Sequence, residues 1–492
     1  MMYQTAINLV PDIPNPTPDY YCTWQTQLYA TNDGKPQGQR AIIGEKALFD
    51  KEKPYGWAYF YEKARRDLLF VMDDSWDVPP NNDPAYFGSL VLDREKFPSF
   101  TQGSTNAQAL KRLSDKLKEI GWKGLGGWVC AQESGAIDSE KSPEAYWKQR
   151  LAEADEAGFS YWKVDWGCRG DSAEFRSMLT KLARTYAPHL IVEHAKAMDS
   201  ITFSDVFRTY DVPAIMSIPM TIQKIAELAA NLPSGSPCLI NSEDEVYTAA
   251  ALGFTMGVMR HPYSGAFCNG KADMSFPEIH RNLKTKLYEV VRAARFHRIA
   301  PAFPVGKEQF FVSDTTLSDS WQLQDAASEI EAWWFENPTI SACIAEGTLT
   351  KSAPSSIARN TQLPIVTPDA NGNVPFVVAS RNPNGVYAVA TLGRTSGRTY
   401  GIPKCDVTIH AGDATTIGAF GEYDQLIINT DVGNIKRILV QDLADTAAFD
   451  ITEAAVIGNG EIRISGEILS QIGTRSQPEN DTSEPGVVIR LE

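Results

Sequence analysis

The chain has 492 residues, enough for two or three domains, and 46 Lys and Arg residues against 61 Asp and Glu residues give a formal net charge of −15 at pH 7. This excess of negative charge repels phosphate backbones and anionic lipids, so binding to nucleic acid or to a membrane surface is disfavoured. Hydrophobic residues make up 43% and charged residues 22% of the chain, as in folded globular proteins, and no apolar run approaches the ~18 residues of a membrane span.

Up to about residue 310, short apolar runs alternate with segments of helical periodicity. The runs that we interpret as strands are 21–26, 68–73, 122–130, 161–165, 190–193, 206–210, 238–240 and 254–259. Alternating strands and helices predict a parallel sheet, and eight repeats predict a (β/α)8 TIM barrel over residues 1–310. An open doubly wound sheet is the alternative fold.

Amphipathic helices lie between these strands, and capping residues mark their ends. Gly121 closes the first, Ser142 followed by Pro143 begins the second, Gly158 ends it, and Asp171 begins the third. This pattern supports the helix half of each repeat.

After about residue 310 the pattern changes to short strands separated by turns. The predicted strands are 376–380, 386–391, 407–410, 426–429, 438–440, 461–465 and 487–491. Asn382-Pro383-Asn384-Gly385 predicts a hairpin between the first two. We therefore expect an all-β sandwich domain over residues 311–492, although 322–375 fits neither pattern clearly.

The distribution of Cys and His residues predicts no metal site and no cofactor. The seven cysteines are scattered without a CxxC pair, and the six histidines form no HxH or HExxH motif. Residues 1–21 have no basic n-region or apolar h-region, so a reducing, cytoplasmic location is expected. A secreted chain trimmed of its signal peptide would look the same, and the sequence gives no indication of oligomeric state.

Charged residues follow several of the predicted strands at the point where each strand ends. They are Asp73, Asp74, Lys163, Asp165, Glu193, Arg208 and Asp211. In a barrel these ends form one rim, where catalytic residues are found. Two carboxylates with neighbouring cations and aromatic walls are typical of glycoside hydrolysis, and the chain is 10% aromatic.

Asp165 is the better candidate for a nucleophile. Lys163 lies two residues earlier, so both side chains point to the same face of a strand, and an ammonium group favours the ionised carboxylate. Asp211 could act as acid/base from across the pocket. A carboxylate separation of about 5–5.5 Å would predict retention of configuration, and roughly 6.5–9.5 Å would predict inversion.

Four motifs then occur in one consistent order between about residues 20 and 260. They are Cys22-Thr23-Trp24-Gln25-Thr26, Asp73-Asp74-Ser75-Trp76, Tyr161-Trp162-Lys163-Val164-Asp165 and Phe207-Arg208-Thr209-Tyr210-Asp211-Val212. This series resembles the α-galactosidases of the glycoside hydrolase clan that contains families 27, 31 and 36, with families 27 and 36 most similar.

The resemblance implies a (β/α)8 barrel with a C-terminal β-sandwich and retaining hydrolysis of terminal α-linked sugars by double displacement. It implies that Asp165 is the nucleophile and Asp211 the acid/base. The substrate-binding residues that it implies are Trp24, Asp73, Asp74, Trp76, Lys163, Glu193 and Arg208.

Some alternatives stay open at this point. Arg208 and Asp211 are one residue closer than in the family motif, so Asp205 is a second candidate for the acid. Among substrates α-galactosides lead, followed by α-N-acetylgalactosaminides, β-L-arabinopyranosides and α-glucosides. A sugar-binding protein that keeps the pocket without catalysis is the non-enzyme alternative.

Overall fold

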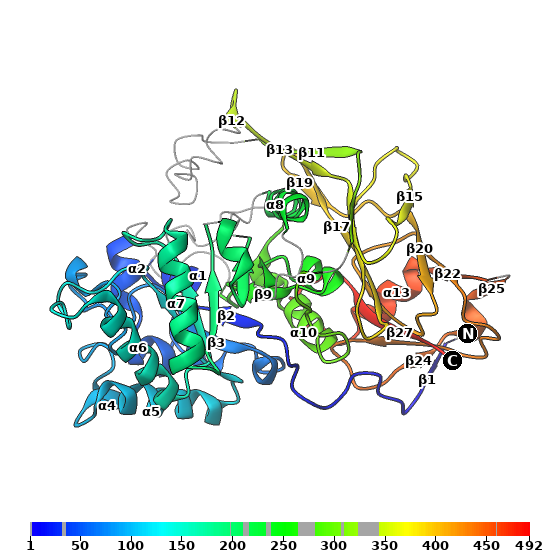
Figure 1. The fold of residues 1–492 in the computed structure, drawn as a ribbon. Coiled ribbons are helices and arrows are strands. Elements are labelled where there is room, and N and C mark those ends of the chain that lie inside the picture. Colours follow the sequence, from blue (N-terminus) through cyan, green and yellow to red (C-terminus); the bar gives the residue numbers. More distant parts are fainter. Residues whose placement is uncertain are drawn as a thin grey trace.

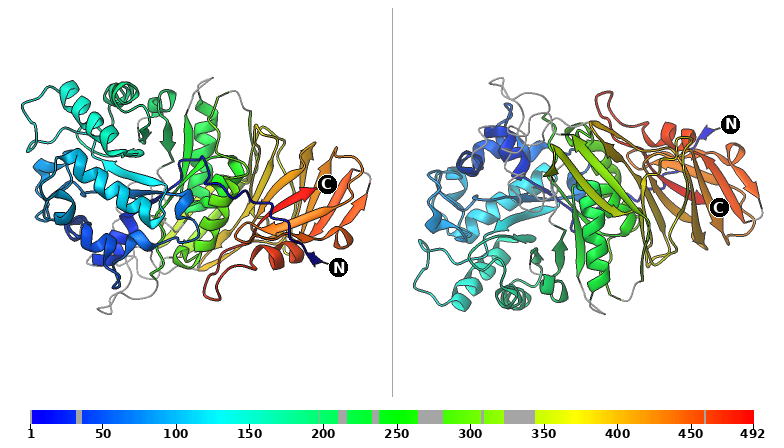
Figure 2. Two further views of the ribbon diagram at one scale, coloured as in Figure 1. Left: turned by 90° about the horizontal axis from the view of Figure 1, so that it is seen from below. Right: turned by 90° about the horizontal axis from the view of Figure 1, so that it is seen from above.

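The computed structural model describes residues 2–31, 36–196, 198–209, 216–232, 238–263, 281–306, 309–322, 344–458 and 460–492. It divides into a barrel and a β-rich region that lie side by side (Figures 1 and 2). Within these ranges no helix is long and apolar enough to cross a membrane.

Eight parallel strands close into a barrel in chain order (Figure 1). They are β2 (Tyr20–Cys22), β3 (Leu69–Met72), β4 (Gly124–Val129), β5 (Tyr161–Val164), β6 (Ile191–His194), β7 (Val206–Arg208), β8 (Leu239–Glu243) and β9 (Thr255–Val258). The eight predicted barrel strands are confirmed, and the closed sheet rules out the doubly wound alternative.

The first strand is shorter than its sequence suggests. It was expected to continue to residue 26, but β2 ends at Cys22 and helix α1 (Trp24–Thr31) begins two residues later. The hydroxyl of Thr23 accepts a hydrogen bond from Asp73 N at 2.9 Å, and its carbonyl accepts one from Gln27 N at 2.8 Å. Thr23 therefore ends the strand and opens the helix, which places Trp24 at the carboxyl end of the barrel.

The three helices predicted from their caps begin at capping residues. Thr105 and Gln108 form a capping box, Ser142 and Gly158 bound the second predicted helix, and Ser172 rather than Asp171 caps the third. The helices of the barrel region are α1, α2 (Pro36–Ile42), α3 (Glu45–Phe49), α4 (Pro98–Thr101), α5 (Asn106–Ile120), α6 (Pro143–Ala157), α7 (Ala173–Tyr186), α8 (Ser217–Asn231), α9 (Val246–Leu252) and α10 (Leu287–Phe296).

Two large sheets form the second region. The nine-stranded sheet has the order β1 (Tyr3–Gln4), β24 (Phe449–Asp450), β23 (Ile438–Asp442), β27 (Gly486–Leu491), β21 (Thr416–Phe420), β17 (Tyr387–Leu392), β16 (Phe376–Arg381), β14 (Ser356–Arg359) and β10 (Phe310–Val312). The five-stranded sheet has the order β15 (Ile365–Thr367), β20 (Asp406–Gly412), β22 (Gln425–Thr430), β26 (Glu461–Ser465) and β25 (Val456–Gly458), with helix α13 (Gly466–Gly473) after β26.

The seven predicted strands and the 382–385 hairpin of this region are confirmed. Two small sheets extend it. One has the order β11 (Thr316–Gln322), β13 (Thr348–Pro354) and β12 (Ile344–Ala345), and the other pairs β18 (Arg394–Ser396) with β19 (Thr399–Gly401).

The central strands of the nine-stranded sheet are buried on both faces, whereas its edge strands β1 and β10 are partly exposed. Val377 and Ala379 of β16 belong to the core between the two large sheets, whereas Phe376 and Val378 belong to the core that the sheet shares with the barrel. Strands buried on both faces read as continuous apolar runs, as in Phe376–Arg381. The sandwich thus uses one side of its larger sheet to cover the barrel.

Candidate active site

Polar side chains gather inside the barrel at the carboxyl ends of its strands. Lys163 of β5 lies opposite Glu193 of β6, and Arg208 of β7 lies opposite Asn241 of β8. Because paired residues point to the same face and side chains alternate along a strand, Asp165 shares the inner face with Lys163.

The carboxylate of Asp165 is held by one ion pair and one hydrogen bond. Arg208 Nη2 lies 3.1 Å from its Oδ1, and Trp128 Nε1 donates to its Oδ2 at 3.0 Å. Burial alone would raise the pKa of this carboxyl, but the charges of Arg208 and Lys163 and the hydrogen bond from Trp128 outweigh burial, so the pKa lies below its ordinary value. Asp165 is therefore ionised at neutral pH.

Lys163 and Asp73 form an ion pair beside Asp165. Lys163 Nζ and Cys22 Sγ both donate to Asp73 Oδ2, at 2.9 and 2.8 Å, and Asp74 N donates to Oδ1 at 2.8 Å. Burial lowers the pKa of Lys163, but the charge of Asp73 raises it above its ordinary value. Burial and the charge of Asp73 also raise the pKa of the Cys22 thiol, which stays protonated.

Arg208 lies among three carboxylates. Besides its contact with Asp165, its Nη1 is 3.3 Å from Glu243 Oε1 and 3.8 Å from Glu193 Oε1. Glu243 Oε1 is also 3.7 Å from Lys163 Nζ. Glu243 therefore fixes both cations that flank Asp165.

Glu193 is closed off from solvent, with an exposed fraction of 0%. Its Oε2 accepts hydrogen bonds from Tyr161 Oη at 2.8 Å and Asn241 Nδ2 at 2.9 Å, and Tyr20 Oη lies 3.3 Å from each oxygen. Burial raises the pKa of Glu193 to about 7. The structure therefore places Glu193 inside the barrel beside Arg208, and its expected contact with substrate stays a prediction.

Asp74 is engaged on both oxygens. Arg40 Nε donates to Oδ2 at 3.0 Å, and Ser75 Oγ donates to Oδ1 at 2.7 Å. Burial is the largest influence on this carboxyl and raises its pKa to about 6, although the Arg40 charge lowers it. Asp74 thus belongs to an ion pair at the edge of the site.

Aromatic rings line one side of Asp165. The rings of Trp128 and Trp166 have centroids 5.2 Å apart, and Phe87 meets Trp166 edge-on at 5.1 Å. Trp24 is partly exposed and packs on the inner barrel cluster that includes Cys22. These rings offer flat apolar faces next to the carboxylates.

Trp76 lies outside this wall, and its expected contact with substrate stays a prediction. Its side chain is buried against Phe159, and its Nε1 donates to the Trp128 carbonyl at 2.9 Å. Gly127 of β4 turns its Cα hydrogens toward the outside of the barrel, and a Cβ added there would lie 3.1 Å from the Trp76 indole. Trp76 therefore braces β4 from its outer face.

Of the two candidates for the acid/base, the structure describes only Asp205. Asp211 falls in 210–215 and lies outside the described residues. Asp205 is excluded, because it precedes β7 and so lies at the amino end of the barrel, opposite to Asp165. There it accepts hydrogen bonds from Arg184 Nη1 and Val192 N, each at 2.9 Å.

Three residues of the site were missed as site residues in the sequence. Glu243 ends β8, and its place in the acidic run 243–245 was a usable signal. Trp128 and Cys22 received no role, because a tryptophan in a glycine-rich strand and an isolated cysteine both read as core residues, although Cys22 stands in the first of the four motifs.

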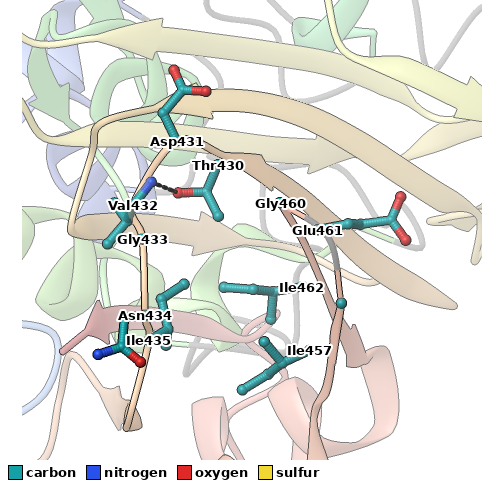
Figure 3. Close-up of a pocket in the computed structure, with 11 residues that line it drawn as sticks. Thr430, Asp431, Val432, Gly433, Asn434, Ile435, Ile457, Gly460, Glu461 and Ile462 are labelled. Carbon is teal, nitrogen blue, oxygen red and sulfur yellow. Dashed lines mark hydrogen bonds between the residues drawn. The ribbon is translucent and has the colours of Figure 1, made fainter.

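Nothing in the described ranges groups three or more His, Cys, Asp or Glu side chains in a way that could hold a metal ion. A cavity of about 350 Å³ lies far from the barrel, between the 430–435 loop and the β25–β26 hairpin (Figure 3). Ile435, Ile457 and Ile462 line it, while Asp431 and Glu461 point away. It lacks the convergent polar groups of the barrel site.

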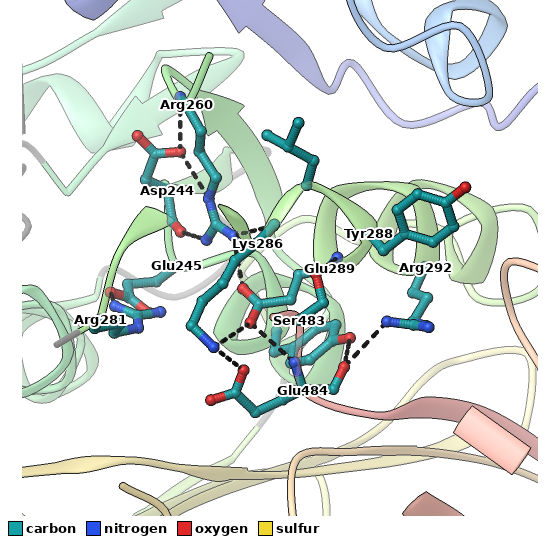
Figure 4. A network of polar contacts seen from close by, with 12 residues as sticks. Asp244, Glu245, Arg260, Arg281, Lys286, Tyr288, Glu289, Arg292, Ser483 and Glu484 are labelled. Carbon is teal, nitrogen blue, oxygen red and sulfur yellow. Dashed lines mark hydrogen bonds and ion pairs between the residues drawn. The ribbon is translucent and has the colours of Figure 1, made fainter. Parts of the chain in front are cut away.

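A buried ion network begins directly after Glu243 and fixes the end of β8 (Figure 4). Asp244 has a left-handed φ of 52°, and its Oδ1 accepts hydrogen bonds from Met259 N at 3.1 Å and Arg260 Nε at 3.3 Å. Such a conformation costs energy outside glycine and persists where its surroundings enforce it. The contacts of Asp244 therefore hold Glu243 in place.

The network continues into the sandwich (Figure 4). Arg260 Nη1 donates to Glu289 Oε2 at 2.6 Å, and Glu289 N donates to Ser483 Oγ at 3.0 Å. Lys286 pairs with Glu484 and lies 3.8 Å from Glu289 Oε1. Residues of the C-terminal region thus contact the groups that fix the end of β8.

No protein-family model and no curated protein sequence matches this chain. Among solved structures, it is similar to a GH27 β-L-arabinopyranosidase from Geobacillus stearothermophilus, with 10% identity, 97% of each chain covered and a TM-score of 0.43. It is similar to an α-galactosidase from Saccharomyces cerevisiae, with 10% identity, 97% of this chain and 98% of that chain covered and a TM-score of 0.40. It is also similar to α-galactosidase I from Mortierella vinacea, with 13% identity, 69% and 93% covered and a TM-score of 0.37.

Proposed function

We propose that the protein is a retaining glycoside hydrolase that cleaves terminal α-linked sugars, with α-galactosides as the leading substrates. The observation that carries the proposal is the setting of Asp165. A buried carboxylate that two cations and an indole N–H keep ionised, next to an Asp–Lys pair and partly exposed aromatic rings, suits a nucleophile in a sugar pocket.

In the proposed reaction an oxygen of Asp165 attacks the anomeric carbon and forms a glycosyl ester, while the bond to the leaving oxygen breaks. Asp211 donates the proton that the leaving oxygen takes up, and then accepts a proton from the water that hydrolyses the ester. Two inversions at the anomeric carbon give net retention. The role of Asp211 rests on the family resemblance alone.

The remaining site residues bind the sugar in this proposal. Asp73 and Lys163 are fixed as acceptor and donor for ring hydroxyls, and Asp74 adds an acceptor at the edge. Arg208 orients Asp165 and, as the family resemblance implies, contacts a sugar hydroxyl, and Trp24 supplies an apolar face for the ring. No cofactor takes part.

The test is a panel of aryl α- and β-glycosides, with the anomers of the products followed by proton NMR. We expect hydrolysis of the α-galactoside with an α-configured first product. An inverted product would refute double displacement. If only the N-acetylgalactosaminide, arabinopyranoside or glucoside is hydrolysed, the assigned sugar changes but the assigned reaction, retaining hydrolysis, stands.

Asp165→Asn should abolish turnover and leave the fold intact, because the amide lacks the nucleophilic charge. We expect a loss of at least ~10⁴-fold in kcat, measured with the best substrate of the panel, with circular dichroism as the check on folding. Near wild-type turnover by this variant would refute the assignment. If instead the folded wild-type protein binds sugars of the panel without hydrolysing any of them, it is a carbohydrate-binding protein.

A further inference from the structure

Arg40, on α2, lies at the edge of the site and is only partly engaged. Its Nε donates to Asp74 Oδ2 at 3.0 Å, and its side chain is 23% exposed, whereas that of Asp74 is 2% exposed. None of the described residues accepts a hydrogen bond from its Nη1 or Nη2. The guanidinium therefore keeps two donor nitrogens for a ligand.

The guanidinium is also held in position. Its Cζ lies 5.1 Å from the Phe87 ring centroid and 5.2 Å from that of Trp166. The carbonyl of Arg40 accepts a hydrogen bond from Lys96 Nζ at 2.9 Å, and Lys96 also donates to the Ser75 carbonyl at 2.6 Å. A cation fixed in this way loses little conformational freedom when it binds a ligand.

Arg40 adjoins the reacting groups along two lines of contact. Its partner Asp74 follows Asp73 and donates its own N–H to that carboxylate at 2.8 Å. Its stacking partner Trp166 follows Asp165 in sequence and packs against Trp128, the donor to Asp165. Arg40 is therefore joined to Asp73 through Asp74 and to the surroundings of Asp165 through Trp166.

The free edge of Arg40 suits an oxyanion. A guanidinium binds two oxygens of a carboxylate or a sulfate with parallel hydrogen bonds, whereas a neutral hydroxyl gains far less from a full positive charge. Neutralisation of Asp74 uses only the Nε contact. Within the described part of the site, Nη1 and Nη2 form no hydrogen bond to a carboxylate.

We propose that Arg40 forms a subsite for an oxyanion on the sugar, so that the preferred substrates are acidic α-glycosides. The oxyanion is a carboxylate or a sulfate ester at the edge of the ring remote from the anomeric carbon. The inference rests on the proposed hydrolase function and specifies its substrate class.

The experiment compares kcat/KM for three aryl substrates: the neutral α-galactoside, its 6-sulfate and the α-galacturonide. Wild-type protein should prefer one of the two acidic substrates, and which one it prefers identifies the anion. Arg40→Gln should lower the acidic-to-neutral ratio of kcat/KM by about 10- to 100-fold, the loss typical of a hydrogen-bonded charge. The same ratio for Arg40→Lys should lie between those of the wild type and Arg40→Gln, because lysine keeps the charge but cannot donate two parallel hydrogen bonds.

Arg66→Gln is the matched control, because it removes the same charge from an exposed pair with Asp12 and should leave the ratio unchanged. An equal loss on neutral and acidic substrates in Arg40→Gln would show that Arg40 only holds Asp74, and would overturn the subsite while hydrolysis stands. So would the absence of any acidic preference in the wild type.

If none of the three substrates is cleaved, binding decides the matter separately from catalysis. Free galacturonate and galactose 6-sulfate should then raise the Tm of the wild type more than galactose does, and Arg40→Gln should remove the difference. Equal shifts for acidic and neutral sugars would overturn the subsite.

Discussion

Trp128 and Arg208 hold the two oxygens of Asp165, and they control its charge in different ways. Arg208 acts through its charge, which several carboxylates share, whereas Trp128 acts through one hydrogen bond to the ionised form. The indole can therefore be removed without adding or removing a charge, which makes the pKa of Asp165 testable.

Trp128→Phe should raise the pKa of Asp165, because the lost hydrogen bond favours the charged carboxylate. The acid limb of kcat/KM against pH should then shift to higher pH by about one unit, as expected for a hydrogen bond to a charged group. Trp147→Phe is the control, because it removes an indole donor to Glu133. An unshifted acid limb in Trp128→Phe would contradict the role of the indole.

The sequence predicts those site residues whose position depends on strand alternation. Lys163 and Asp165 are two residues apart at a strand end, so their shared face follows from local geometry. The donor to Asp165 could not be predicted, because Gly124–Val129 has no alternation of polar and apolar residues. Whether Trp76 faces into or out of the barrel likewise depends on tertiary packing.

At the scale of elements, the end of β8 connects the site to the segment 481–484. Glu484 and Glu289 share Lys286 in a buried setting. Burial and the charge of Glu289 raise the pKa of Glu484, while burial is outweighed at Glu289 by Arg260, which lowers its pKa. Between about pH 4.5 and 7, folded protein therefore keeps a proton on Glu484 that unfolded protein releases.

A raised carboxyl pKa in the folded state means that stability is lost as pH rises above the ordinary value of 4.5. Glu484→Gln, which resembles the protonated form, should flatten the fall in Tm between about pH 4.5 and 7, corresponding to about 1–3 kcal/mol. Thermal denaturation across this range measures it. Glu461→Gln, in a surface pair with Arg463, should leave the slope as in the wild type.

Equal slopes in wild type and Glu484→Gln would show that Glu484 is ionised in the folded state. That result would leave the contacts of the network in place and remove its dependence on pH.

The sequence predicts whether a segment is a helix or a strand better than it predicts where the element ends or which strands pair. The eight barrel strands are visible as apolar runs, but the turn from β2 into α1 depends on Thr23 contacting Asp73, fifty residues away in sequence. The pairing of β1 with β24 joins Tyr3 to Asp450, and two-residue strands leave no periodic signal. The division into 1–310 and 311–492 and the cytoplasmic location stay predictions.

At the scale of the whole molecule, barrel and sandwich share one core. Phe420 of β21 contacts Tyr247 of α9 and Phe296 of α10, with ring centroids 4.8 and 5.2 Å apart. Arg292 of α10 forms a buried ion pair with Asp442 of β23 at 2.9 Å. The two regions should therefore unfold together.

Phe420→Ala should destabilise the molecule by about 3–5 kcal/mol, because it removes a buried ring from this shared core. Tryptophan fluorescence, which is dominated by the barrel, and far-UV circular dichroism should still change in one coincident transition. Ile428→Ala, in the core between the two large sheets, should shift the fluorescence transition as well. Separate transitions would refute the shared core.

The pairing of β1 in the sandwich has a practical consequence for handling the protein. The strand order β1-β24-β23-β27 puts both ends of this chain on the same sheet, at the side of the molecule away from the barrel (Figures 1 and 2). Attachment to a bead or an electrode through either end should therefore leave the barrel open to dissolved substrate. A short peptide that joins the two ends would allow circular permutants whose new termini lie in barrel loops.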